Sequence, residues 1–263
     1  MAVVDPAGAY GPALDVASHL VRHLQASGVG LLLRDEALYG ASELSVARHV
    51  HRVPVSLTVR SRTTAEYEFR TRVRHVERRL SQAAMGAAGA WTLVVESGVT
   101  REQVIGAMRE GDLIVVGQTE GGESAYGRLG EALLARGPRP LLMVPPHAQP
   151  VASVQVVYED TPAGDAALPL AAALARAMDV VSLQVIVVGD LDPNEKETVE
   201  ARLSQFGIPV VVLLQPHLDL PAAARVLQVK RGLLILPATV FEREGPSLPY
   251  SLRMLGWPFL LVP

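Results

Sequence analysis

Short runs of branched apolar residues alternate with longer segments rich in alanine and leucine through the second half of the chain. Runs such as 185–188 and 210–214 are almost continuously apolar, which is typical of strands covered on both faces in a parallel sheet. The longer segments carry apolar residues at helical spacing, as at Leu168, Ala172 and Ala175. This alternation predicts an α/β fold built on a doubly wound parallel sheet.

The same pattern gives the element order of the second half. The predicted strands are 154–158, 180–188, 208–214, 233–236 and 259–262. The predicted helices are 163–178, 193–206 and 221–229, and a proline at its first turn supports the start of the second of them. The residues between the last two strands are predicted as a connection.

The first half repeats this order with additions. Its predicted strands are 2–4, 29–34, 91–96, 112–116 and 141–144, and its predicted helices are 12–26, 65–84, 101–109 and 128–135. Gly28 is predicted to close the first helix, because glycine is common just past a helix end. Residues 36–64 do not follow the pattern, and residues 54–59 fit either an extra strand or an extended loop.

Both halves end in the same way. The first half ends with the segments DLIVVGQT at 112–119 and RPLLMVP at 139–145. The second half ends with two similar segments, GLLILPAT at 232–239 and WPFLLVP at 257–263. Self-similarity at this period indicates one domain used twice. The prolines of PPHAQP, at 145–150, cannot continue a helix or a strand and are predicted to form the linker.

The composition narrows the class of protein. The 263 residues allow two domains, predicted at 1–146 and 151–263, each able to bury a core. Hydrophobic residues make up 49%, and the net charge of −3 gives no basic excess to attract nucleic acid or an anionic membrane. The absence of cysteine excludes disulfides and thiolate nucleophiles. No signal peptide and no run of about 20 apolar residues is present, so we expect a cytoplasmic protein.

Specific residues in both halves resemble a known family. VVGQ at 115–118 with the downstream Gly130, followed by RPLLMVP, is similar to the end of a universal stress protein domain. VVYEDTPA at 156–163 and AAALARA at 171–177 are similar to the beginning of one. The resemblance implies two tandem universal stress protein domains of the adenine nucleotide alpha hydrolase-like type. It also implies that their last strands pair within the chain, as an intramolecular pseudo-dimer that removes two apolar sheet edges.

The resemblance also implies a phosphate loop after the fourth strand of each domain. Nucleotide-binding members of the family carry Gly-x-x-Gly, nine residues, then Gly-Ser or Gly-Thr there, since bare backbone N–H groups bind phosphate. In the first half Gly117 and Gly130 match, whereas Glu120 and Glu131 stand in place of the second glycine and the hydroxyl residue. A loop shifted by one residue would use Gly121 instead.

The implied nucleotide contacts in the first half are therefore Asp5, Gly117, Gln118, Gly121 and Gly130. Asp5 matches the family's acidic residue at the end of the first strand, although an Asp-Pro turn into the helix explains it equally well.

The second half departs further from the family's loop. Pro237, Val240 and Tyr250 replace the three glycines, and only Ser251 is retained. Proline and bulky side chains block close approach of a phosphate, so we expect no ATP binding through this loop. Glu159 falls at the position of the acidic residue and is interpreted as a turn residue rather than a ligand contact.

Two functions remain open at this point. The favoured hypothesis is a non-enzymatic universal stress protein-like regulatory or interaction protein in the stress response, with protein partners or self-association through the last strands. The alternative is an ATP- or AMP-binding stress sensor that uses the first domain, with magnesium and weak ATP hydrolysis. The sequence shows no catalytic motif and no metal-binding motif, so neither a catalytic residue nor a metal ligand is predicted.

Three further groups of residues were considered. His19 and His23 share a helix face and could bind a metal, but no third ligand is apparent, so a surface role is favoured. His49 and His51 could share one side of a strand, with the same interpretation. The helix at 65–84 is rich in arginine interleaved with glutamate, which fits a solvated face better than a site for an anion or an acidic protein.

Overall fold

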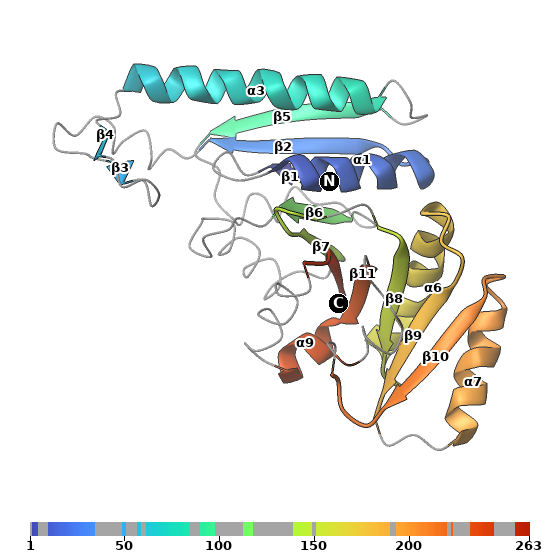
Figure 1. Cartoon of the computed structure of the whole chain (residues 1–263). Coiled ribbons are helices and arrows are strands. Elements are labelled where there is room, and N and C mark those ends of the chain that lie inside the picture. Colours follow the sequence, from blue (N-terminus) through green and yellow to red (C-terminus); the bar gives the residue numbers. More distant parts are fainter. Residues whose placement is uncertain are drawn as a thin grey trace.

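A computed structural model provides the structure of the chain. It describes residues 2–4, 10–34, 49–50, 57–58, 62–84, 90–97, 113–117, 139–148, 151–189, 193–219, 222, 232–244 and 256–263. Within these residues one ten-stranded sheet runs through the molecule in the order β10-β9-β8-β11-β12-β7-β6-β1-β2-β5. In Figure 1 the N-terminal end lies near β1 and the C-terminal end lies near β11.

The first half supplies five strands of this sheet, in the order β5-β2-β1-β6-β7, and all of them are parallel. Its elements are β1 (Ala2–Val4), α1 (Tyr10–His23), β2 (Gly28–Arg34), α3 (Arg62–Ala84), β5 (Trp91–Ser97), β6 (Ile114–Gly117) and β7 (Leu141–Val144). Separately, β3 (His49–Val50) pairs antiparallel with β4 (Leu57–Thr58), so of the two alternatives left open for 54–59 the extra strand is present at Leu57–Thr58.

The second half supplies the other five strands, in the order β10-β9-β8-β11-β12, and these are also parallel. Its elements are β8 (Ser153–Tyr158), α6 (Pro162–Ala177), β9 (Leu183–Val188), α7 (Pro193–Ser204), β10 (Val210–Gln215), β11 (Gly232–Pro237), α9 (Ala238–Glu244) and β12 (Phe259–Val262). In each half the strands therefore lie in the order third, second, first, fourth, fifth, which confirms the doubly wound α/β fold predicted for both repeats.

The two halves meet through their last strands. β12 pairs with β7, and this is the antiparallel pair within the ten-stranded sheet. Leu142 lies opposite Leu260, and Met143 lies opposite Phe259. All four side chains are buried, and the helices α1 and α6 that follow the first strand of each half also contact each other. The pairing of the last strands within the chain, implied by the resemblance, is present.

Among the described residues, an ion pair joins α1 to α3 in the first half and another joins α6 to α7 in the second. In the first half the Arg79 guanidinium of α3 lies 3.0 Å from Asp15 of α1. In the second half the Arg202 guanidinium of α7 lies 3.0 Å from Asp165 of α6. Because all four side chains are at least a third exposed, each pair contributes about 0.5 kcal/mol. The repeated pairing is a further sign of the internal symmetry.

Two predicted boundaries were wrong for the same reason. The first helix ends at His23 rather than at the predicted Ala26, because Gln25 adopts a left-handed conformation with φ of 51°. Gly28 instead begins β2, where a Cβ atom would come within 2.4 Å of the Trp91 indole. The strand predicted from 180 begins only at Leu183, because Asp179 has a φ of 51° and turns the chain.

The antiparallel seam can be tested by disulfide trapping, which is straightforward in a chain without cysteine. The variant with Met143→Cys and Phe259→Cys is expected to form an intramolecular disulfide, because directly opposed residues have Cβ atoms about 5 Å apart. The matched control carries Met143→Cys and Leu260→Cys. Leu260 faces Leu142, and its side chain therefore points to the other side of the sheet. Equal crosslinking of both pairs would contradict the register.

Candidate functional site

The carboxyl ends of the strands form the edge where a doubly wound sheet binds ligands. The binding crevice opens where the chain reverses the direction in which it adds strands. In the first half this point lies between β1 and β6, and in the second half between β8 and β11. The structure describes Gly117 at the first of these edges and Glu159 and Pro237 at the second.

In the first half, the structure describes one of the five predicted contact residues. Gly117 is the last residue of β6, is buried, and pairs with Val144 of β7. β6 runs beside β1, with Val116 opposite Val3, so Gly117 lies at the carboxyl edge next to the end of β1. Asp5, Gln118, Gly121 and Gly130 lie outside the described residues, as do Glu120 and Glu131. The nucleotide site of the first half stays a prediction.

In the second half, a helix begins directly at the corresponding edge. β11 ends at Pro237, and α9 begins at the next residue, Ala238. Pro237 and Val240 are the residues that the sequence resemblance aligns with two of the family's loop glycines, and the Val240 side chain is fully buried. Figure 1 shows α9 on the left of the second-half strands, with α6 and α7 on their right. Tyr250 and Ser251 lie outside the described residues.

The acidic residue of this edge has a partner within the chain. Glu159 follows β8, and its side chain is 11% exposed. The carboxylate forms an ion pair and a hydrogen bond with the Arg243 guanidinium of α9, which is half exposed. The Glu159 carbonyl also accepts a hydrogen bond from the Thr161 N–H at 2.7 Å, as its predicted turn role requires. Sequence reasoning missed the ion pair, because Arg243 lies 84 residues further along the chain.

The turn from β8 into α6 is tightly built. Thr161 caps the helix, and its side-chain oxygen accepts a hydrogen bond from the Gly164 N–H at 3.1 Å. A Cβ atom at position 164 would lie 2.0 Å from the Glu159 carbonyl oxygen. Only glycine therefore allows the first turn of α6 to lie this close to the end of β8. The turn fixes the position of Glu159, whose carboxylate binds Arg243 of α9.

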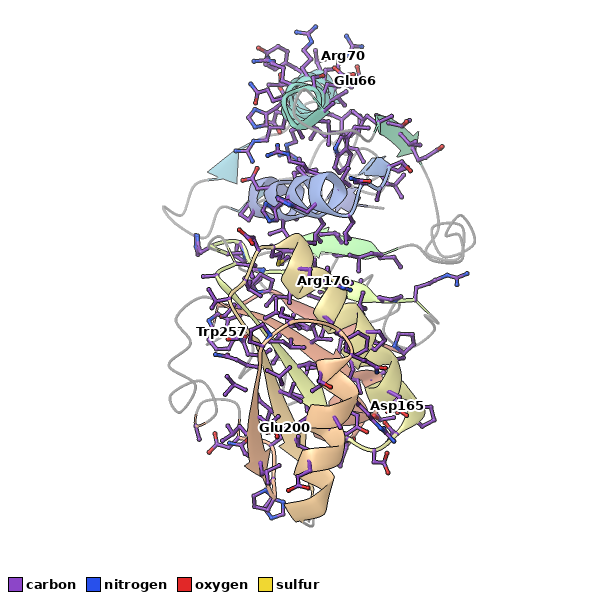
Figure 2. The ribbon with its side chains drawn as sticks, turned by 90° about the vertical axis from the view of Figure 1, so that its right-hand side faces the viewer. Glu66, Arg70, Asp165, Arg176, Glu200 and Trp257 are labelled. Atoms are coloured by element: carbon purple, nitrogen blue, oxygen red, sulfur yellow. The ribbon has the colours of Figure 1, made fainter. Side chains whose placement is uncertain are left out.

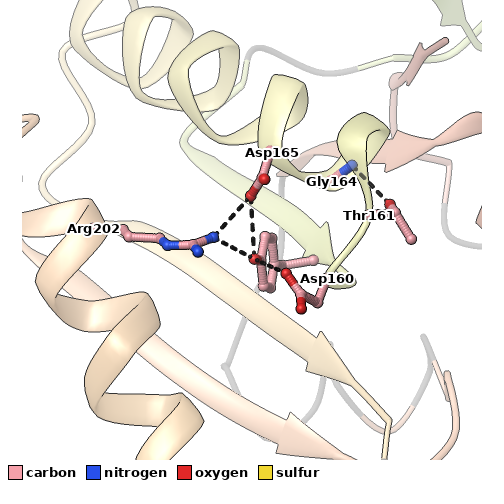
Figure 3. A network of polar contacts seen from close by, with 6 residues as sticks. Asp160, Thr161, Gly164, Asp165 and Arg202 are labelled. Atoms are coloured by element: carbon pink, nitrogen blue, oxygen red, sulfur yellow. Dashed lines mark hydrogen bonds and ion pairs between the residues drawn. The ribbon is translucent and has the colours of Figure 1, made fainter.

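A second polar cluster lies beside this turn and connects β8, α6 and α7 (Figure 3). The Tyr158 hydroxyl accepts a hydrogen bond from Arg202 at 3.0 Å and lies 3.2 Å from a carboxylate oxygen of Asp165 and 3.4 Å from one of Asp160. Burial raises the pKa of the Tyr158 hydroxyl to about 12, and Asp165 adds to this while Arg202 opposes it. The phenol is therefore protonated near neutral pH. A protonated phenol held by three partners suits a structural role.

The ion pair at the edge makes an asymmetric prediction about stability. Arg243→Ala is expected to lower the free energy of unfolding by about 2 kcal/mol, because it leaves a largely buried carboxylate without its partner. Glu159→Gln is expected to cost less than about 1 kcal/mol, because the half-exposed guanidinium can be hydrated. Urea denaturation of both variants measures the difference. Equal costs for the two variants would contradict this asymmetry.

The histidine pair of α1 does not form a metal centre with other described residues. The His19 and His23 rings lie 4.2 Å apart, centroid to centroid. Burial lowers the pKa of His19, and the neighbouring His23 and Arg22 lower it further. Among the residues that the structure describes, no group of three or more His, Cys, Asp or Glu side chains could hold a metal ion. His51, considered with His49 from the sequence, lies outside the described residues.

The arginine-rich helix α3 lies on the outside of the first half. Figure 2 shows Glu66 and Arg70 on its outer surface, remote from Asp165. An open depression of about 460 Å³ runs along this helix. Its lining residues are Arg74, Glu77, Arg78, Ser81 and Gln82. The lining mixes both charges with neutral polar groups, as the sequence interpretation of a solvated face expects. None of the helices within the described residues has the length and apolar character needed to cross a bilayer.

Comparison with known proteins shows which solved structures share this fold. No protein-family model and no curated protein sequence matches the chain. Among solved structures, a universal stress protein from Archaeoglobus fulgidus DSM 4304 matches with a TM-score of 0.64 at 14% sequence identity, over 99% of this chain and 94% of that one. A protein from Pseudomonas aeruginosa UCBPP-PA14 assigned to the same family matches with a TM-score of 0.52 at 14% identity, over 99% and 91%. The chain therefore has the fold of the universal stress proteins.

Proposed function

We propose that this chain is a regulatory or interaction protein of the universal stress protein type, which takes part in the stress response through protein partners and has no catalytic activity. The fold over nearly the whole chain supports the family context. The observation that carries the proposal is the edge of the second half, where Val240 is buried and Arg243 binds Glu159. We infer that α9, which begins directly after Pro237, stands in place of the family's glycine loop and leaves no bare backbone there for a phosphate.

The first half supports the proposal through its sequence. Glu120 and Glu131 stand where the family's loop presents a glycine and a hydroxyl to the phosphates. One carboxylate about 5 Å from a phosphate charge costs about 3 kcal/mol at an effective dielectric constant of about 20. A micromolar affinity is worth about 8 kcal/mol, so a few such pairs would abolish binding in the absence of a cation between them.

Calorimetric titration of the full chain with ATP and magnesium tests this proposal. The wild-type chain is expected to show no saturable binding tighter than about 1 mM. A variant with Glu120→Gly and Glu131→Ser restores the family's loop in the first half, and it is expected to gain micromolar binding. Adding Gly130→Val to that variant is the matched control, because a bulky side chain there is expected to remove the gain.

The opposite result would favour the nucleotide sensor. Binding of ATP or AMP by the wild-type chain that Gly130→Val abolishes would mean that the first domain uses Asp5, Gly117, Gly121 and Gly130 with a cation. Release of phosphate by the wild-type chain, lost in the same variant, would contradict the non-enzymatic part of the proposal.

A further inference from the structure

The strand β10 ends the ten-stranded sheet on the side of the second half. Its six residues, VVVLLQ, include neither a charge nor a proline. On its inner side all six pair with β9, from Val210 opposite Leu183 to Gln215 opposite Val188. No strand of the described residues pairs with its outer side.

Two hydrogen bonds show which backbone groups face outward. The Leu183 N–H donates to the Pro209 carbonyl at 2.9 Å, and the Gly189 N–H donates to the Gln215 carbonyl at 3.1 Å. Since backbone groups alternate in direction along a strand, the odd-numbered residues between them direct their N–H and C=O groups toward β9. Val210, Val212 and Leu214 therefore direct theirs toward the open side.

The side chains of this edge are also unprotected. Val211 is 46% exposed and Leu214 is 39% exposed, which places both among the large exposed apolar side chains of the described residues. The opposite end of the sheet differs, because β5 carries the exposed Glu96. Edge strands that stay unpaired normally carry charges or prolines that prevent association. The six residues of β10 include neither a charge nor a proline.

We propose that β10 pairs antiparallel with β10 of a second copy of this chain, across a two-fold axis at Val212. This register places Val212 opposite Val212 of the second copy, and Val210 opposite Leu214 of the second copy. The three outward-facing residues of each strand then exchange N–H and C=O hydrogen bonds. Val211 comes to lie opposite Leu213 of the second copy, so every cross-strand pair of these five residues is apolar.

A second copy fits this edge better than an unrelated strand for two reasons. The sequence is self-complementary under the two-fold axis, since reversal brings apolar residues onto apolar residues and never opposes like charges. Pairing also consumes the open edge in both copies, so the assembly closes as a dimer. The chain already contains this mode of association, because β7 and β12 pair antiparallel through short apolar strands. The inference is independent of nucleotide binding.

Sedimentation of the full chain and of two edge variants tests the pairing. The wild-type chain is expected to form a dimer. Leu214→Pro removes an outward-facing N–H that β9 does not use, and Val211→Glu places a carboxylate in an apolar pair. Each is expected to raise the dimer dissociation constant at least about tenfold. Val181→Glu, at a position 88% exposed in the turn before β9, is the matched control and is expected to leave the dimer intact.

Disulfide formation tests the register independently of these variants. Val212→Cys is expected to give covalent dimers under mild oxidation, because the axis brings the two copies of this residue together. Val211→Cys is expected to give few, because its opposite residue is Leu213. Three results would each overturn the proposal. They are a wild-type chain that stays monomeric at about 100 μM, a dimer that is unchanged in both edge variants although these are folded, and equal crosslinking of the two cysteine variants.

Discussion

Replacing Gly164 with alanine is expected to lower the free energy of unfolding by about 3 kcal/mol, although alanine is the better helix former. The added Cβ atom would lie 2.0 Å from the Glu159 carbonyl oxygen, and the Glu159 carbonyl carbon and backbone nitrogen are each 3.2 Å away. These are backbone atoms of the turn that enters α6, so they cannot move aside as a side chain does. Chemical denaturation of the full chain measures the loss.

The equivalent helix of the first half offers a matched control. Gly11 lies in the first turn of α1, where an added Cβ atom would come 3.0 Å from a terminal nitrogen of Arg79. That guanidinium ends a flexible, partly exposed side chain and can shift. Gly11→Ala is therefore expected to change stability by less than about 1 kcal/mol, in either direction. A similar loss for both variants would show that close backbone approach does not explain Gly164.

Truncating Leu260 at the seam between the halves is expected to cost about 3 kcal/mol, because it removes a fully buried side chain and leaves a cavity. Leu260 lies directly opposite Leu142 of the first half, which is also buried. Leu260→Ala is therefore expected to lower the stability of both halves together. Denaturation followed by two probes, one in each half, measures whether the transitions coincide.

Leu142→Ala and the double variant complete this measurement. If the two leucines pack against each other, the cost of the double variant is expected to differ from the sum of the single costs by about 1 kcal/mol. Additive costs would mean that the two side chains contribute separately. Loss confined to the second half would contradict a shared core at the seam.

The fold was predictable because its strands are short, buried and apolar on both faces. The predicted strands at 141–144 and 259–262 coincide with β7 and β12, and the repeat that they close predicted that the same strand order occurs twice. The errors fall where apolar residues lie outside a strand. Val180 and Val181 extend the apolar pattern of β9, but Val181 is 88% exposed in a turn that Asp179 begins. Composition alone cannot distinguish such a turn from the strand it precedes.

The helix α9 was missed for a different reason. It has seven residues, which make fewer than two full turns of an α-helix. A helix this short is too short to show a regular spacing of apolar residues. The sequence predicts from Pro237 and Val240 that the glycine loop is absent there, but it does not predict a helix. What occupies the space depends on contacts between distant residues, above all Arg243 with Glu159, and spacing along the chain does not encode them.

The pairing of β7 with β12 inside one chain has a consequence for how each crevice can vary. In an assembly of two identical subunits, every substitution appears twice, so a residue that closes one crevice closes the other as well. Here different residues of one chain form the two crevices, so a substitution in one crevice leaves the other unchanged. Val240 and Arg243 can close the crevice of the second half while the residues after Gly117 vary on their own. One polypeptide can thus carry an inert copy as scaffold and leave the other free to acquire or lose a ligand.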